Sequence, residues 1–289
     1  MREKRAFTLI ELLVVIAIIA LLLSIVVPSL KNAKELAAAA VCMSNNRQLG
    51  MAYYTYASES KGYLADAQPA SLNRGWSLQG TKTFTLPNGS QHRARAFVGE
   101  PRDETGAFRN INLQDQIRGF QVGAMWPYMG SSDIFHCPID RRYNAPPTSP
   151  YPAANNTIGG YRTYSLGGVL SAAFYGITTT GEGDYVAIKY SEFNNPGSKI
   201  TFLEEQAGDG HNDNTWNVYL NTPQWWDPFA IVHNGASTFA YADGHAERHK
   251  WTDKNMIEYA ATGAKNAPVD TTSDDYNWFR RAYIPGRPK

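Results

Sequence analysis

Ionisable side chains near the C-terminus of the chain could bind a metal ion. His233 is followed by nine residues and then by Asp243-Gly244, and a second histidine, His245, comes directly after. Imidazole nitrogens and carboxylate oxygens are common ligands of zinc and similar divalent ions. If strand ends of one sheet bring these residues together, they could share one ion with a carboxylate from Glu204 or Glu205. The alternative is structural, with Asp-Gly forming a tight turn and His233 hydrogen-bonding to that turn or to an adjacent strand.

Two aspartates in a short acidic segment are candidate calcium ligands. Residues 209–214 contain Asp209 and Asp213, and carboxylate oxygens are preferred ligands of calcium. The segment is similar to the start of an EF-hand loop, but Asn214 stands where that loop needs glycine, and the distal glutamate is absent. A solvated acidic loop is therefore the alternative.

The sequence contains no familiar catalytic motif. It lacks the Gly-x-Ser-x-Gly segment, the phosphate-binding loop and the His-Glu-x-x-His pair. A formal charge of +1 also gives no electrostatic reason to expect a nucleic acid partner. We therefore predict that the protein is not an enzyme, that it does not bind nucleic acid, and that it needs no cofactor apart from the Ca²⁺ or other divalent ion considered above.

One carboxylate lies at the start of a long apolar segment. Residues 12–30 carry no charge, and as a helix they could cross a hydrocarbon core of roughly 30 Å. An ionisable group at this depth costs about 2.5–3.5 kcal/mol on insertion scales, so Glu11 needs a partner or a purpose. Because Arg2, Lys4 and Arg5 precede the segment, we expect the N-terminus in the cytoplasm and the rest of the chain outside the membrane.

The first residues resemble the N-terminal signal of type IV pilins and type II secretion pseudopilins. A basic leader and the small residue Ala6 precede Phe7-Thr-Leu-Ile-Glu11 and the apolar segment. The resemblance implies that a prepilin peptidase cuts between Ala6 and Phe7 and methylates the new amine. It also implies that Glu11 meets the N-terminal amine of a neighbouring subunit during filament assembly. Family members usually have glycine where this chain has Ala6, and Pro28 matches the proline that kinks the helix of many pilins.

An amphipathic helix is predicted to continue from the apolar segment. Between Leu30 and Tyr56, apolar side chains recur at steps of three or four residues and are interrupted only by Asn45. Lys61-Gly62 is expected to end the helix. A plain membrane anchor would explain the length and orientation of the apolar segment, but not the position of Glu11 beside Phe-Thr-Leu-Ile.

The rest of the chain predicts an α+β fold, in which the long helix packs on a head domain with an antiparallel sheet. Alternating and β-branched residues predict strands at residues 81–86, 161–166, 184–190 and 199–204, and a hairpin of residues 237–242 and 245–251. Asp243-Gly244 predicts a two-residue type I′ turn in that hairpin. A short helix is expected within residues 117–129. The predicted organisation is a leader at 1–6, a transmembrane helix at 7–30, an amphipathic helix at 31–60 and a globular head at 61–289.

The two cysteines could join the helix to the head. An even number of cysteines in an exported domain is typical of disulfides. Cys137-Pro-Ile-Asp140 is similar to the Cys-Pro-x-Asp segment of a pilin-like subfamily that also has the His-x9-Asp-Gly motif. This resemblance favours a disulfide between Cys42 and Cys137, and two unrelated buried thiols are the alternative. Secretion pseudopilins hold calcium in a C-terminal loop, which would involve Asp209 and Asp213.

The leading functional prediction is a structural subunit of a type IV pilus-like or pseudopilus-like filament. Prepilin peptidase would process it, the inner membrane would store it as a single-pass protein, and other pilin-like subunits would be its partners in an extracellular or periplasmic filament. The alternative is a membrane-tethered binding protein that never polymerises. It would hold a glycan at Trp225-Trp226 or a metal at the hairpin, although the two tryptophans could equally pack against a neighbouring subunit or in the core.

Overall fold

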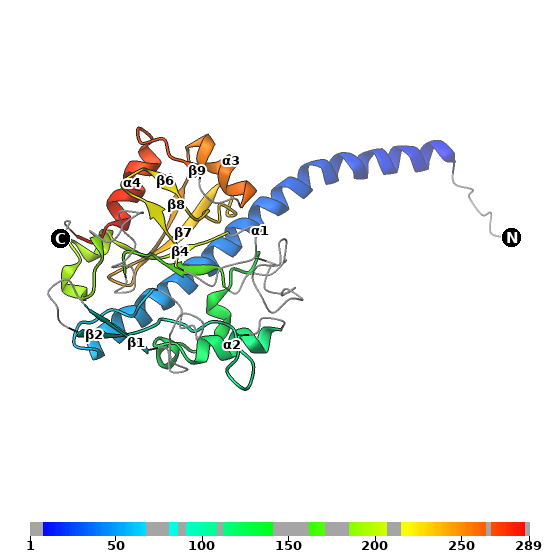
Figure 1. Ribbon diagram of the computed structural model, residues 1–289. Helices are drawn as coiled ribbons and strands as arrows, with labels where there is room; N and C mark the ends of the chain where they lie inside the picture. Colours follow the sequence, from blue (N-terminus) through cyan, green and yellow to red (C-terminus); the bar gives the residue numbers. More distant parts are fainter. Residues whose placement is uncertain are drawn as a thin grey trace.

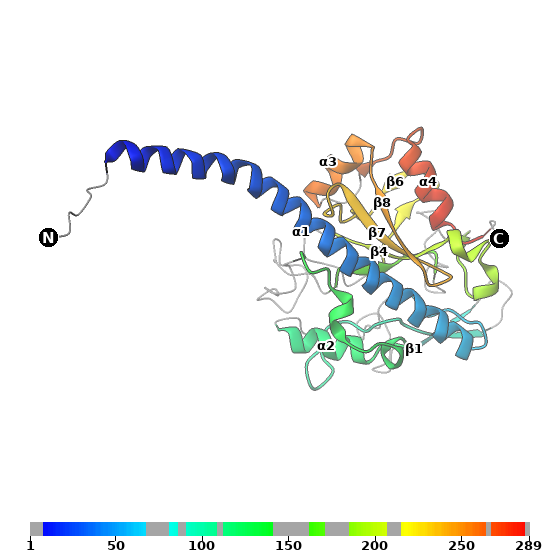
Figure 2. The same cartoon turned by 180° about the vertical axis from the view of Figure 1, so that it is seen from behind.

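A single helix, α1 (Leu9–Glu59), runs along one side of the head domain and projects far beyond it (Figures 1 and 2). The computed structural model describes residues 8–67, 81–85, 91–108, 112–140, 162–170, 185–206, 215–263 and 267–286. The helix is unbroken through Pro28 and curves where it leaves the head (Figure 1). It ends as predicted, because Lys61 and Gly62 both have positive φ angles and Gly62 N donates to the carbonyl of Ala57.

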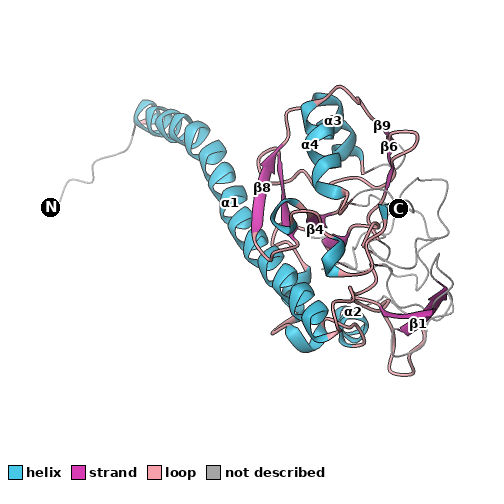
Figure 3. Ribbon diagram, turned by 90° about the vertical axis from the view of Figure 1, so that its left-hand side faces the viewer, coloured by secondary structure: helices cyan, strands magenta, loops and turns pink. Residues whose placement is uncertain are grey.

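The central sheet has four antiparallel strands in the order β3-β4-β7-β8. These strands are β3 (Tyr164–Leu166), β4 (Ile200–Glu204), β7 (Ala236–Tyr241) and β8 (Ala246–Lys250). The sheet lies between α1 on one face and α4 (Asp274–Tyr283) on the other (Figure 3). The predicted α+β fold, with a long N-terminal helix on an antiparallel sheet, is confirmed.

The smaller elements surround this sheet. They are the hairpin of β1 (Thr81–Thr85) and β2 (Gln91–Arg95), the helices α2 (Leu113–Gln121) and α3 (Lys254–Thr262), and a sheet of β5 (Val218–Tyr219), β6 (Gln224–Trp225) and β9 (Ala267–Pro268). Short 3-10 turns are η1 (Trp126–Tyr128), η2 (Ser132–Phe135), η6 (Tyr190–Glu192) and η7 (Pro196–Ser198). The helix expected within residues 117–129 begins earlier, as α2, because the Asn112 side chain accepts a hydrogen bond from Asp115 N.

The two faces of β7 separate two parts of the core. Ala240 points to α1, where its Cβ lies close to Gly50, whereas Phe239 points away and stacks edge-on against Trp278 of α4. Aromatic rings fill the α4 side, with Trp216, Trp225, Phe229, Trp251 and Phe279 in mutual contact. This alternation follows from the two-residue period of a strand covered on both faces.

The buried face of α1 differs from the predicted stripe in its first half. Burial begins at Ala38, and Leu30, Ala33, Ala37 and Val41 are exposed. From Asn45 onward the predicted stripe is buried, and Asn45 itself is satisfied because its side chain donates to the carbonyl of His136 at 3.1 Å. The apolar period alone could not locate the point at which the helix leaves the head.

The predicted strand at residues 184–190 is wrong for its described part. Residues 185–189 form no ladder, because their backbone groups bond to separate segments. Ala187 N donates to Val169 O, while Ile188 N donates to the carboxylate of Glu192 at 2.6 Å. The backbone of this segment is therefore irregular and leads into η6, which begins at the last residue of the predicted strand.

The β7–β8 hairpin forms where it was predicted, but its turn is different. Tyr241 N donates to His245 O and Gly244 N donates to Tyr241 O, so the loop holds three residues instead of two. Gly244 has a φ of +89° and Asp243 does not have a positive φ. This is a three-residue loop with a glycine bulge, in place of a type I′ turn. A side chain at Gly244 would also collide with Met51 of α1.

Candidate functional site

The N-terminal end of α1 is organised by Thr8 and Glu11. Thr8 Oγ1 accepts from Glu11 N at 3.3 Å, and the Glu11 carboxylate accepts from Thr8 N and Thr8 Oγ1, both at 2.8 Å. This reciprocal pair is a capping box, which satisfies donors that a helix start otherwise leaves free. In the isolated chain, the Glu11 carboxylate therefore serves the start of its own helix. Ala6 and Phe7, the predicted cleavage residues, lie outside the described residues.

The first half of α1 is apolar and uncovered. Every residue from Leu9 to Lys34 is exposed in the structure. By length and composition, the helix could cross a membrane. The hydroxyls of Ser24 and Ser29 donate back to the carbonyls of Leu21 and Ile25, which keeps these polar groups satisfied within the helix. This half of α1 is therefore suited to lie in a bilayer or to pack against other apolar helices.

A second candidate site is buried between α1 and the sheet. Potential ligand atoms of Cys42, Cys137, Glu204 and His233 all lie within 4.8 Å of one another. All four residues are fully buried, at 0% exposure. His233 Nε2 lies 2.9 Å from Glu204 Oε1 and 3.6 Å from Cys137 Sγ. Within the part of the chain that the structure describes, this is the one group of three or more such side chains that converges.

Four separate segments supply these side chains. Cys42 comes from the buried face of α1, and Cys137 follows η2. Glu204 is the last residue of β4, and His233 precedes β7. Because strand side chains alternate, Glu204 shares the α1 face of the sheet with Phe202, whose ring contacts Tyr53 of α1. The packing of α1 on the sheet therefore assembles the cluster.

Hydrogen bonds outside the cluster hold its members in place. Glu204 Oε2 accepts from Thr238 N at 2.7 Å, and Cys137 N donates to Thr163 Oγ1 at 3.0 Å. The carbonyl of His233 accepts from the guanidinium of Arg248 at 2.7 Å. The backbone of the residue after His233 is tied to α1, because Asn234 N donates to the Glu35 carboxylate at 3.0 Å.

The four groups shift one another's ionisation. A hydrogen bond with Cys42, and another with His233, lower the pKa of the Cys137 thiol, although burial opposes them. The same contact with Cys137, followed by burial, raises the pKa of the Cys42 thiol. Burial acts to lower the pKa of His233, but hydrogen bonds to Cys137 and Glu204 outweigh it and raise that pKa to about 10. The cluster thus favours a thiolate at Cys137, the form that binds metals.

The structure separates two residues that the sequence suggested as shared ligands. His233 and His245 lie at opposite ends of β7, a strand of 6 residues, or about 20 Å at roughly 3.3 Å per residue. His245 instead pairs with Asp243 at 2.5 Å on the exposed hairpin tip and stacks on Tyr241. Asp209 and Asp213 lie outside the described residues.

The predicted disulfide is not confirmed. Cys42 and Cys137 do lie together, and they join α1 to the head as expected, but both are free thiols. The sequence singles out each member of the cluster separately, the two cysteines as a disulfide pair and His233 and Glu204 as metal ligands. It gave no signal that the cysteines, the glutamate and the histidine share one place, because no short ligand spacing links them.

The adjacent tryptophans occupy different environments. Trp225 is buried in the aromatic core, with its ring against Phe229 and Phe279. Trp226 is half-buried, and its ring packs on Tyr219 with centroids 4.9 Å apart. Only one of the two rings is therefore placed to contact a sugar or another subunit.

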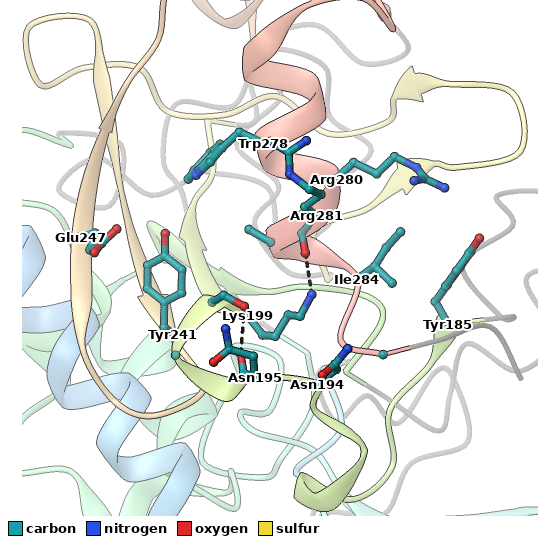
Figure 4. Close-up of a pocket in the computed structure, with 14 residues that line it drawn as sticks. Tyr185, Asn194, Asn195, Lys199, Tyr241, Glu247, Trp278, Arg280, Arg281 and Ile284 are labelled. Carbon is teal, nitrogen blue, oxygen red and sulfur yellow. Dashed lines mark hydrogen bonds between the residues drawn. The ribbon is translucent and has the colours of Figure 1, made fainter.

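An open groove of about 850 Å³ lies beside α4 and η7 (Figure 4). Lys199 Nζ donates to the carbonyl of Arg281 across it at 2.7 Å. Trp278, Tyr241 and Glu247 line the wall on the side of the hairpin. The mixture of cations, a carboxylate and aromatic rings suits a contact surface, and burial lowers the pKa of Lys199.

Comparison with known proteins identifies the N-terminal segment. Residues 1–27 match the family model described as the prokaryotic N-terminal methylation motif. The motif supports a pilin- or pseudopilin-type precursor and implies processing by prepilin peptidase. With the apolar half of α1, it is consistent with a single-pass anchor in the inner membrane and suggests a structural protein more than an enzyme. No curated protein and no solved structure matches the chain.

Proposed function

We propose that the chain is a structural subunit of a type IV pilus-like or type II secretion pseudopilus-like filament. The uncovered apolar half of α1 is the observation that carries this proposal. About half of a long helix has no partner in its own head, so it requires an apolar environment before and after assembly. The bilayer supplies that environment during storage, and the corresponding helices of other subunits supply it in a filament.

The methylation motif supports the same assignment. Cleavage before Phe7 creates an amine four residues ahead of Glu11, within the segment that matches the motif. In an assembled filament, the Glu11 carboxylate of one subunit neutralises the Phe7 amine of its neighbour. In surroundings of low dielectric constant such a pair selects one register, because a mispaired charge is costly.

Photo-crosslinking in cells that express prepilin peptidase tests the proposal. A crosslinking amino acid at Leu22, on the apolar half of α1, is expected to give a ladder of oligomers from the processed chain. The matched control carries Ala6→Arg, which blocks cleavage and should leave monomers in the membrane. A processed chain that yields only monomers would contradict filament assembly and point to a tethered, non-polymerising protein.

A further inference from the structure

We propose that Cys42, Cys137, Glu204 and His233 bind one zinc-like divalent ion, which fastens α1 to the head. This inference is independent of filament assembly, because it concerns the inside of one subunit. Four side chains that can each bind a metal ion are at 0% exposure, and their ligand atoms all lie within 4.8 Å of one another, which distinguishes this group from the other buried polar residues of the head. A pair of charges can satisfy Glu204 and His233, but it does not account for two thiols turned to the same point.

The donor set selects the class of ion. Two sulfurs, one imidazole nitrogen and one carboxylate oxygen match the tetrahedral sites of zinc. Calcium and magnesium take oxygen ligands, so they do not suit this cluster. The potential calcium ligands considered from the sequence, Asp209 and Asp213, belong to a different segment.

Two of the distances in the cluster are close to those that a bound ion requires, and all of the ligand atoms lie within 4.8 Å of one another. Bond lengths of about 2.0–2.3 Å place tetrahedral donors about 3.3–3.8 Å apart. The separation of 3.6 Å between Cys137 Sγ and His233 Nε2 already fits. The 2.9 Å between His233 Nε2 and Glu204 Oε1 must lengthen by a few tenths of an ångström. A small rotation of the carboxylate, with Oε2 still held by Thr238 N, provides that change.

The surrounding contacts already orient the ligands. Outer hydrogen bonds fix Glu204 through Thr238 and Cys137 through Thr163, as in established metal sites. Nδ1 of His233 has no hydrogen-bond partner among the described residues, so the polar contacts described for the ring all run through Nε2 into the cluster. The imidazole is thus positioned by the site itself.

A cavity borders the cluster at one of its four ligands. A cavity of about 210 Å³ reaches Cys137 and is also lined by Asp140, Thr163 and Gln206. Ile139, Ala230 and Val232 complete the lining, so oxygen atoms and apolar groups share this cavity beside the Cys137 ligand. The buried thiols would remain shielded from larger reagents.

Metal titration of the full chain tests the site. The protein is purified in detergent under reducing, metal-free conditions, and Co²⁺ is added as a spectroscopic probe before competition with Zn²⁺. We expect one equivalent of Co²⁺ to give thiolate charge-transfer bands and the visible bands of tetrahedral cobalt, both abolished by Zn²⁺. This measurement uses the unaltered chain, so it does not depend on whether a variant folds.

Variants then assign the ligands. Cys42→Ser, Cys137→Ser and His233→Ala are each expected to weaken Zn²⁺ binding by at least about 100-fold, beyond the effect of removing an outer contact. His245→Ala is the matched control, because this histidine lies on the exposed hairpin tip and its loss should leave binding unchanged. Binding that survives both cysteine variants would overturn the proposal.

The oxidation state of the two cysteines in the native protein distinguishes a metal site from a disulfide. Trapping of thiols in unfolded protein from the native membrane, together with elemental analysis, counts free cysteines and bound metal. Two free thiols with one zinc per chain support the site. A disulfide between Cys42 and Cys137 without metal, or free thiols that bind neither Co²⁺ nor Zn²⁺, would refute it.

Discussion

At the scale of single residues, the Glu11 carboxylate has two roles that it cannot fill at the same time. In the isolated chain, the carboxylate closes a capping box with Thr8. In the proposed filament, it pairs with the amine of another subunit. The capping contact must therefore be exchanged for the intermolecular one on assembly, and the two roles can be separated by substitution.

Glu11→Gln is expected to keep the capping box, since glutamine also serves in that position, but to abolish incorporation into filaments. Thr8→Ala is the matched variant, because it loses the cap and keeps the charge, so it should still assemble. Filament yield measured by shearing and immunoblotting checks both, with membrane insertion as the control. Normal assembly of Glu11→Gln would remove the carboxylate from the mechanism.

Asp275 shows how one carboxylate ties three elements together. It accepts hydrogen bonds from Thr252 N and Asp253 N, both at 2.7 Å, and from His249 at 2.9 Å. Burial acts to raise the pKa of Asp275, but these hydrogen bonds outweigh it and hold the pKa below its ordinary value of 3.8. The stabilisation is therefore fully present above that value and is lost as the pH falls through the lower folded-state pKa.

Asp275→Asn is expected to lower the free energy of unfolding by about 1–3 kcal/mol at neutral pH. It should also reduce the loss of stability on acidification below about pH 4, because the variant has no carboxylate to protonate. Urea unfolding of the full chain in detergent, followed by tryptophan fluorescence at neutral and acidic pH, measures both. Asp274→Asn, at an exposed position in the same helical turn, is the control and should behave like the unaltered chain.

At the scale of elements, the β7–β8 hairpin contacts α1 at two places, one before β7 and one after it. His233, before the strand, reaches Cys42 in the buried cluster, while Gly244, after it, meets Met51. The nine residues between His233 and Asp243 therefore span the width of the contact between the hairpin and the helix. The His-x9-Asp-Gly motif therefore has a structural role, which is to hold the hairpin against α1.

Gly244→Ala is expected to destabilise the fold by roughly 1–3 kcal/mol, because φ is +89° and the new Cβ would lie 2.4 Å from Met51 Sδ. Adding Met51→Ala should recover the steric part of this loss and leave the backbone strain. Gly130→Ala is the control, since its Cβ would meet open space. Denaturant unfolding of the full chain measures all of them, and equal stability of Gly244→Ala and the unaltered chain would contradict the close contact.

At the scale of the whole molecule, the sequence predicted local elements better than it predicted sites that form only through tertiary packing. The length of α1, its end just before Lys61-Gly62 and the β7–β8 hairpin follow from periodicity and turn residues, which act within a few positions. The strand expected near residue 187 failed because tertiary contacts bonded its backbone elsewhere. The buried cluster could not be predicted, since its four members come together only when α1 packs on the sheet.

The same helix forms the anchor and one wall of the core, without a linker between them. Buried residues of α1 extend from Ala38 to Ala57, and the central sheet, together with η1, η2 and the segment after the helix, covers them. A pull on the anchor is therefore transmitted directly into the domain. The load would act in shear along many contacts at once, rather than peeling them apart one by one, so extraction of the anchor from a membrane would move the head as a rigid body.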